Sequence, residues 1–329
     1  MDKNQNLSTK PTRRLYRQRR RSKRWLKWLL SFLLLAVAVV AIFAGIAWHN
    51  LSNATDNMYN KSNQTTRGIE QQMDAKKPIS FLLFGTDTGA LGRDYKGRTD
   101  TIMIIVLNPT TRKTTIVSLP RDMKVNLPDY SQYSPSKINA AYTYGGVDET
   151  IEVVKDYFKI PIYGYALVNM GGLEKSIDQV GGVNVTSPLT FDYEGYHFDK
   201  GQTYHMNGAK ALAFSRMRYT DPHGDYGRQQ RQRLIIMALL KESASYRTVL
   251  NSTFLNGISK EMQTDLTMSR MLKLATGYRT SLGKVNSTFA QGTSANISGV
   301  SFEVVSAAER QRISTKLRRQ LGLNPVTIN

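Results

Sequence analysis

Residues 79–85 read ISFLLFG, an almost uninterrupted apolar run that is closed by a glycine. Such a run is typical of a strand that is buried on both faces. Two more runs of this kind follow, TIMIIVL at 101–107 and TTIVSL at 114–119. The segment between them, NPTTRK at 108–113, is short, polar and begins with Asn-Pro, which indicates a turn. These two strands are therefore expected to form an antiparallel hairpin within a mixed sheet.

Helical segments alternate with further strands downstream of this hairpin. Apolar residues recur with helical spacing at, for example, Ile151, Val154 and Phe158. The expected helices cover 138–144, 147–158, 170–180, 207–214, 228–241, 268–274 and 308–321, and the additional strands 163–168, 183–185 and 302–305. This order predicts the α/β (α+β) class, with a central mixed β-sheet flanked by helices.

One segment before the first strand predicts a transmembrane helix. Residues 28–48 contain 21 residues of which only Ser31 is polar, enough to span a hydrocarbon core of roughly 30 Å. Trp25, Trp28 and Trp48 occupy positions where interfacial aromatic residues are common. A cleaved signal peptide is the alternative, but its apolar core is normally shorter. We therefore expect a single span whose N-terminal side is cytoplasmic.

Charge is concentrated in front of this predicted span. The 329-residue chain has a formal net charge of +20, and residues 1–27 contain eleven Lys or Arg against Asp2 alone. Such a cluster orients a span with that end in the cytoplasm, and beside a bilayer it contacts anionic lipid rather than nucleic acid. The expected organisation is a basic tail at 1–27, a membrane helix at 28–48, a polar extracellular spacer at 49–77 and an extracellular domain at 78–329.

The composition excludes several classes of site. The chain has no cysteine, so disulfides, thiolate catalysis and cysteine-ligated metals are ruled out. The common nucleotide-binding, zinc-protease and serine-hydrolase motifs are missing. The four histidines are scattered, and although His197 and His205 could share a loop, two ligands without a third do not predict zinc.

Carboxylates stand at the ends of two predicted strands. Asp87 follows the first strand in FGTD, and Asp100 precedes the second in GRTDT. Two carboxylates at neighbouring strand ends can bind a hard cation such as Mg²⁺. The alternative is that both are ordinary turn residues, because aspartate is common in turns.

Arginines form the densest polar cluster of the chain, in FSRMRYTDPHGDYGRQQRQR at 214–233. The alternation of Arg216 and Arg218 predicts a strand with both side chains on one face. Arg228 is expected to begin a helix, with Gln232 one turn later on the same side. Guanidinium groups at a helix N-terminus predict a phosphate site. A solvated cationic face, or pairing with aspartates inside the segment, is the alternative.

Together the carboxylates and arginines predict phosphoryl transfer. A metal and several guanidiniums would neutralise a pyrophosphate and the charge that develops in the transition state. Arg121 and Asp122, after the third strand in SLPRD, are expected at the same rim of the sheet. Either Asp122 or Asp225 could accept a proton from an attacking hydroxyl.

At this point the sequence resembles the LytR-CpsA-Psr family of Gram-positive bacteria. The basic tail and single span are similar, and the match is strong over residues 78–242. It is carried by five motifs in order, FGTD, GRTDT, SLPRD, KINAAY and SRMRYTDPHGDYGRQQRQ.

The resemblance implies a phosphotransferase on the outer face of the membrane. It would move a teichoic acid, capsular polysaccharide or similar glycopolymer from an undecaprenyl-pyrophosphate carrier to peptidoglycan and form a phosphodiester. The family also implies an apolar pocket for the polyprenyl chain, with walls expected from the strands and from helices 138–158 and 234–240. The implied roles are Mg²⁺ (or Mn²⁺) binding by Asp87 and Asp100, pyrophosphate binding and catalysis by Arg121, Arg216, Arg218 and Arg228, pyrophosphate binding by Gln232 and Lys137, and catalysis by Asp225.

Three other functions are compatible with parts of the pattern. A DNA-binding regulator would fit the charge, but the sequence has no helix-turn-helix motif, and the expected topology places the domain away from DNA. A non-catalytic polymer-binding scaffold would use the same arginines. A polyprenyl pyrophosphatase would differ only in using water as the acceptor.

Overall fold

The structure is a computed structural model that describes residues 45, 48, 49, 52, 53, 55–86, 97–243 and 262–328. Residues 1–50 form one compact unit, and residues 51–329 form a second unit that contains the central sheet. The predicted basic tail lies outside the described residues, as does the predicted span apart from residues 45 and 48. Within the described part of the chain, no helix is both long and apolar enough to cross a bilayer.

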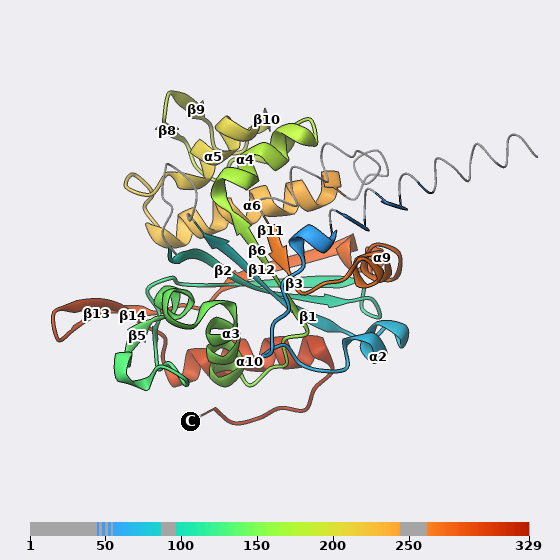
Figure 1. Ribbon diagram of the computed structural model, residues 1–329. Coiled ribbons are helices and arrows are strands. Elements are labelled where there is room, and N and C mark those ends of the chain that lie inside the picture. Colours follow the sequence, from blue (N-terminus) through green and yellow to red (C-terminus); the bar gives the residue numbers. More distant parts are fainter. Residues whose placement is uncertain are drawn as a thin grey trace, which may run out of the picture. The chain divides into compact units, whose positions relative to one another are not determined.

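A six-stranded mixed sheet forms the centre of the second unit (Figure 1). Its strands, in spatial order, are β11 (Met262–Thr264), β6 (Gly164–Asn169), β1 (Ile79–Thr86), β2 (Thr99–Asn108), β3 (Lys113–Leu119) and β12 (Lys284–Phe289). β1, β2 and β3 are antiparallel neighbours, whereas β6 runs parallel to β1 and β12 runs parallel to β3. The predicted hairpin and the predicted mixed sheet are both confirmed.

One face of the sheet is covered by α3 (Ile138–Phe158) and α10 (Ala307–Leu321) (Figure 1). Alternate residues of the three central strands, such as Phe84, Ile104 and Val117, form one buried cluster with both helices. α3 merges the two helices expected at 138–144 and 147–158, and Gly146 between them has φ 70°, outside helical values. The chain therefore changes direction in the middle of α3.

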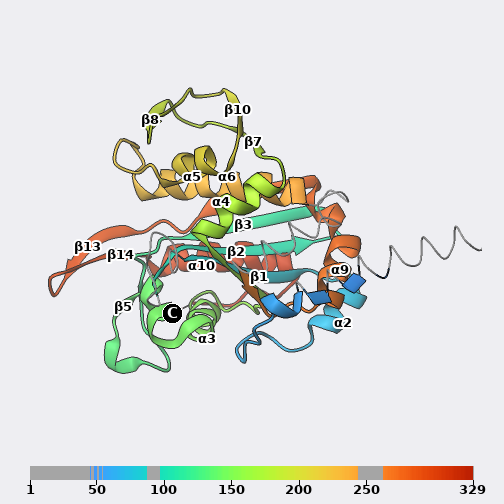
Figure 2. The same cartoon turned by 45° about the horizontal axis from the view of Figure 1, so that its top comes forward.

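The other face of the sheet is covered by α4 (Met170–Gln179), α5 (Gly208–Arg216) and α6 (Asp225–Ser243), as Figures 1 and 2 both show. Arg233 of α6 donates from Nη1 to Ser118 Oγ of β3 at 2.7 Å. Because α3 and α6 lie on opposite faces, the expectation that both would wall a single lipid pocket is wrong.

Smaller elements extend this framework. Strands β4 (Lys124–Val125) and β5 (Ser136–Lys137) pair with each other and flank the short helix η1 (Ser131–Tyr133). The remaining elements are α2 (Ile69–Asp74), β7 (Val183–Thr186), β8 (Phe191–Tyr193), β9 (Tyr196–Phe198), β10 (Thr203–Met206), α9 (Met268–Gly277), η2 (Arg279–Gly283), β13 (Thr293–Ile297) and β14 (Val300–Val304).

The described part of the segment expected as a spacer belongs to the domain instead. Met58, Ile69 and Met73 are buried, and Thr66 N donates to Ile162 O at 2.6 Å. α2 carries two of these apolar residues one turn apart, and they pack with Ile79 of β1. The segment 49–77 was predicted to be a spacer because most of its residues are polar, and its few buried apolar residues form no clear pattern in the sequence.

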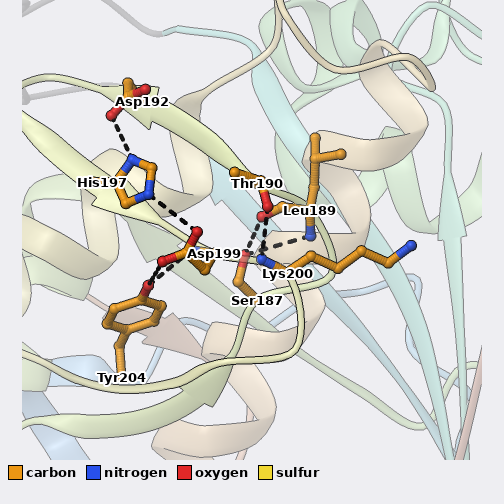
Figure 3. Close-up of polar contacts among 8 residues, drawn as sticks. All are labelled: Ser187, Leu189, Thr190, Asp192, His197, Asp199, Lys200 and Tyr204. Atoms are coloured by element: carbon orange, nitrogen blue, oxygen red, sulfur yellow. Dashed lines mark hydrogen bonds and ion pairs between the residues drawn. The ribbon is translucent and has the colours of Figure 1, made fainter.

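His197 and His205 do not form a common site. Figure 3 shows His197 between two carboxylates, with Nδ1 2.8 Å from Asp192 Oδ1 and Nε2 3.1 Å from Asp199 Oδ1. The ring is exposed, at the β8–β9 hairpin. His205 instead contacts the Asn184 side chain across the β7–β10 pair, with Nδ1 3.1 Å from Oδ1.

Candidate active site

A cavity of about 760 Å³ lies at the rim of the sheet where β2 begins and β3 ends. Its charged lining comes from separate elements, because Asp100 is in β2, Arg121 and Asp122 directly follow β3, and Lys137 ends β5. The full lining is Gly97, Arg98, Asp100, Arg121, Asp122, Lys137, Asn139, Thr143, Arg218 and Ser301. Four cationic side chains and two carboxylates therefore face one polar cavity, which suits an anionic ligand.

Arg121 connects the carboxylates of this cavity. Its Nη1 donates to Asp100 Oδ1 at 2.8 Å, and its Nε lies 3.8 Å from Asp122 Oδ2. Lys137 Nζ lies 3.0 Å from the other oxygen of Asp122. Burial lowers the pKa of Arg121, but Asp100, Asp225 and Asp122 outweigh it and raise the pKa above its ordinary value. The guanidinium is held charged and in a fixed orientation.

Arg228 lies behind this rim in the first turns of α6. Its Nη2 is 2.6 Å from Asp225 Oδ1, and Asp225 Oδ2 accepts from Gln229 Nε2 at 2.8 Å. Burial lowers the pKa of Arg228, and although Asp225 opposes this, Arg121 adds to it. Its Nε is buried with no hydrogen-bond partner in the described part of the chain. An unpaired buried donor is costly unless a ligand satisfies it, so this nitrogen is suited to an anion.

Two further polar residues of α6 serve mainly to fix the helix. Gln232 Oε1 accepts from Thr101 Oγ1 of β2 at 2.9 Å, which fixes α6 over the strand that carries Asp100. Arg231 is fully buried, donates from Nε to Phe214 O at 2.9 Å and forms an ion pair with Asp221. The loop before α6 is therefore tied to the helix from inside the protein.

Comparison with known proteins assigns the chain to a family. A sequence profile of the LytR_cpsA_psr family matches residues 45–319. The chain belongs to the LytR_cpsA_psr family. It is 39% identical over 280 residues to a polyisoprenyl-teichoic acid–peptidoglycan teichoic acid transferase TagU of Enterococcus faecalis, which covers 85% of this chain and 91% of that protein. Identity to TagU of Bacillus cereus is 36% over 263 residues, covering 79% and 85%.

Solved structures agree with this assignment. An Enterococcus faecalis protein described as a transcriptional regulator is 32% identical, with a TM-score of 0.68, and the match covers 77% of this chain and 91% of that one. B. subtilis TagU is 29% identical, with a TM-score of 0.62 and coverage of 76% and 100%. The mixed α/β fold of the LytR_cpsA_psr family is thus present here.

The structure brings only some of the residues expected from the sequence to the cavity of this family member. Asp100, Arg121, Lys137 and Arg218 line it. Asp225 and Arg228 act electrostatically on Arg121 and on each other without being lining residues. Asp87 lies outside the described residues.

Arg216 and the start of α6 differ from the prediction. The expected strand through Arg216 and Arg218 is wrong, because α5 continues to Arg216 and Arg218 follows its C-terminus. The two side chains therefore do not alternate on one face, and Arg216 is not among the lining residues of the cavity. α6 begins at Asp225 rather than at Arg228, so Asp225 lies in its first turn, where the helix dipole favours a carboxylate.

Asn139 is a site residue that the sequence reasoning missed. It is buried in the first turn of α3, lines the cavity, and its Oδ1 has no hydrogen-bond partner within the described residues. Its backbone N–H donates to Arg121 O at 3.1 Å, so the helix start and the arginine are directly linked. An asparagine between the apolar positions of KINAAY was the available signal, since buried amides are normally hydrogen-bonded.

The described residues provide one of the two carboxylate ligands that were predicted for a hard cation. Asp100 supplies a carboxylate at the cavity, and while its Oδ1 is bonded to Arg121, its Oδ2 has no hydrogen bond or ion pair within the described chain. A carboxylate oxygen next to a polar cavity is the donor that Mg²⁺ prefers, with waters as its other ligands. When bound, such an ion would draw charge from phosphate oxygens.

Proposed function

We propose that this protein transfers an anionic glycopolymer of the teichoic acid or capsular polysaccharide type from an undecaprenyl-pyrophosphate carrier to peptidoglycan. The observation that carries the proposal is the charge-lined cavity, in which Arg121, Lys137 and Arg218 face one another and Arg228 is buried next to it. Guanidinium groups suit phosphate oxygens because of their planar fork. The activity for which the TagU relatives are named, teichoic acid transfer to peptidoglycan, supports the same reaction class.

An apolar path for the lipid is supported on the α6 face of the sheet. Leu83 and Ile105 belong to the two central strands, yet both are only half-buried. In β2 and β3 the residues of this face include Met103 and Ser118, and Ser118 is the partner of Arg233 of α6. Apolar residues of α6 itself are also half-buried, namely Leu234, Ile236, Met237 and Leu239. Burying exposed apolar surface of this kind favours a hydrocarbon ligand.

The proposed step is an in-line displacement at phosphorus. A peptidoglycan hydroxyl oxygen, expected at C6 of N-acetylmuramic acid, bonds to the phosphorus that carries the polymer, and that phosphorus loses its bond to the bridging oxygen. The polyprenyl phosphate leaves with the bonding electrons, and the hydroxyl proton passes to a carboxylate. Asp122 lines the cavity and suits this role, whereas Asp225 is not among the lining residues and holds Arg228.

Mg²⁺ (or Mn²⁺) at Asp100, together with Asp87, is part of the proposal. The arginines would bind the pyrophosphate oxygens, and Gln232 keeps α6 in register with β2. Arg216 is kept as a substrate-binding candidate on the family resemblance alone, because its position at the end of α5 gives no direct support.

The reaction is proposed to occur outside the cell. Residues 28–48 would anchor the chain as a single span with residues 1–27 in the cytoplasm. A lipid pyrophosphate in the outer leaflet brings its own activated phosphoryl group, so no ATP is required there. The basic tail would contact anionic lipid rather than a specific nucleic acid.

The direct test is transfer of radiolabelled polymer from a polyprenyl pyrophosphate to peptidoglycan by the full-length protein. Wild type is expected to transfer in a Mg²⁺-dependent manner, and Asp100→Asn and Arg228→Ala are expected to lose transfer. Binding of polymer by Asp100→Asn should remain, because the near-isosteric change leaves the arginines in place.

The alternatives give different results in the same assay. A scaffold would bind polymer equally in wild type and Asp100→Asn while transferring none. A pyrophosphatase would release polymer phosphate at the same rate with or without peptidoglycan. Equal transfer by wild type and both variants would reject the proposed site.

A further inference from the structure

A second group of carboxylates lies away from the cavity, on the opposite side of the kink in α3. Oxygens of Asp129, Glu149 and Glu152 all lie within 4.8 Å of one another. Asp129 is on the exposed loop between β4 and β5, whereas Glu149 and Glu152 follow Gly146 in α3. Three like charges at this spacing repel one another unless protons or a cation neutralise them.

Glu149 is the unusual member of this cluster. Its side chain is only 2% exposed, and both of its carboxylate oxygens are buried without a hydrogen-bond partner among the described residues. The backbone N–H of Asp129 favours the charged form of Glu149, but it does not form a hydrogen bond of normal geometry. A buried carboxylate without partners is strongly unfavourable, so a proton or a cation is needed to satisfy it.

The neighbouring groups supply that positive charge only in part. Burial raises the pKa of Glu149, and Asp129 and Glu152 raise it further. Burial and Asp129 likewise raise the pKa of Glu152, and Lys155 opposes this only in part. The Lys155 ammonium donates instead to Gln64 O at 2.8 Å. Within the described part of the chain, the negative charge of this cluster is therefore compensated only in part, by Lys155.

We propose that Asp129, Glu149 and Glu152 form a binding site for a divalent cation of the Ca²⁺ type. Three carboxylates can provide up to about six oxygens, which fits the six to eight oxygen ligands of Ca²⁺ better than Mg²⁺, which keeps most of its waters. Asp129 is exposed, so water can complete the coordination shell. This site is separate from the one proposed at Asp100 and does not depend on the proposed function.

The cation would fix a hairpin that supplies the active-site rim. β4 and β5 pair at the base of this hairpin, where Asp122 and Lys137 line the cavity, and Asp129 lies near its tip. Binding would connect the tip to α3, whose first half contributes Asn139 and Thr143 to the same cavity. The bound cation would thus fix the position of the β4–β5 hairpin relative to α3, and both elements contribute residues to the cavity wall.

Tyrosines next to the cluster make a direct probe available. A Cβ at Gly145 would lie 2.4 Å from Glu149 Cβ and 2.6 Å from Tyr130 Cε2, so the Tyr130 ring is a close neighbour of Glu149. The Tyr144 ring stacks on the Tyr133 ring with 4.3 Å between the ring centroids, and its centroid lies 6.3 Å from that of Tyr130. Terbium binds at calcium-type carboxylate sites, and excitation of these tyrosines should produce its sensitised emission.

The experiment uses full-length protein that carries Asp100→Asn and is kept in detergent. The substitution prevents a metal at the proposed active site from contributing to the terbium emission. Terbium emission should rise to saturation and should be displaced by Ca²⁺. Adding Glu149→Gln should weaken terbium and Ca²⁺ binding by at least about tenfold, since even the loss of outer-shell partners has that effect. Asp156→Asn, on the same helix but outside the cluster, is the matched control and should bind as the parent does.

Thermal unfolding provides a second readout. Ca²⁺ should raise the Tm of the parent and of Asp156→Asn, but not that of Glu149→Gln. Should Glu149→Gln fail to fold, Asp129→Asn tests the same site from its exposed loop, where folding is not at risk. The inference is overturned if terbium emission is absent, or if Ca²⁺ raises the Tm of the cluster variants as much as that of the parent.

Discussion

Arg121 Nη1 donates to Asp100 Oδ1 at 2.8 Å, so the residue that follows β3 is joined to a residue at the start of β2. Both residues line the cavity. The pair therefore combines a candidate metal ligand with a candidate phosphate ligand in one rigid unit. Truncating either side chain to alanine is expected to disturb both roles, whereas the near-isosteric Asp100→Asn leaves the arginine in place.

Replacing Arg121 should impair transfer without unfolding the protein. We expect Arg121→Ala to lower kcat about 10²–10³-fold, comparable to the loss of one oxyanion-stabilising donor. Arg121→Lys should recover little, because an ammonium cannot reproduce the planar fork. Transfer of labelled polymer measures the effect, with Arg279→Ala as the control, since Arg279 is exposed in η2 beside the opposite end of β3. Full activity of Arg121→Lys would show that only the charge matters.

Asp122 and Asp225 should separate in their kinetic effects. Asp122 lines the cavity and Asp225 holds Arg228, so we expect Asp122 to accept the proton and Asp225 to position the arginine. Asp122→Asn should lower kcat about 10²–10⁴-fold with little change in KM. Asp225→Asn should raise KM as well, because Arg228 loses the carboxylate that holds it. The opposite pattern, with KM unchanged only in Asp225→Asn, would assign the base to Asp225.

The sequence predicted the central strands because their apolar runs are buried on both faces. β12 escaped prediction since Lys284–Phe289 is polar and half-exposed at the sheet edge, where burial leaves no clear pattern. The alternation of Arg216 and Arg218 was misleading, because a helix end placed the two arginines by chance at strand-like spacing. Asp100 and Arg121 could be found from their places at strand ends. Asn139 left only an indirect signal, an amide between the apolar positions of KINAAY, and Glu149 left none, because the lack of hydrogen-bond partners depends on elements distant in sequence.

The buried ion pair of Arg231 and Asp221 should dominate the stability of the α6 region. Their side chains are 1% and 2% exposed. We expect Asp221→Ala to lower the free energy of unfolding by about 3–5 kcal/mol, because a guanidinium is left buried without its partner. Gly227→Ala should also destabilise, since a Cβ there would lie 1.9 Å from Asp221 Oδ2. Urea unfolding measures both variants.

The matched comparison for this pair is an exposed one. Lys273 lies 2.6 Å from Asp74, which is 64% exposed, and such surface pairs contribute little. Asp74→Asn is therefore expected to change the free energy of unfolding by less than about 1 kcal/mol. Similar losses for Asp221→Ala and Asp74→Asn would mean that the buried pair has no special role.

His197 should report the local charge of the β8–β9 hairpin. Hydrogen bonds to Asp192 and Asp199 (Figure 3) raise its pKa above the ordinary 6.5, and the side chain is exposed. Because the folded-state pKa is raised, the stabilisation is fully present below the unfolded pKa and is lost as the pH rises through the folded value. NMR titration should give a raised pKa that Asp192→Asn and Asp199→Asn each lower, more strongly at low salt. A pKa of His197 that neither substitution moves would contradict the carboxylate origin of the shift.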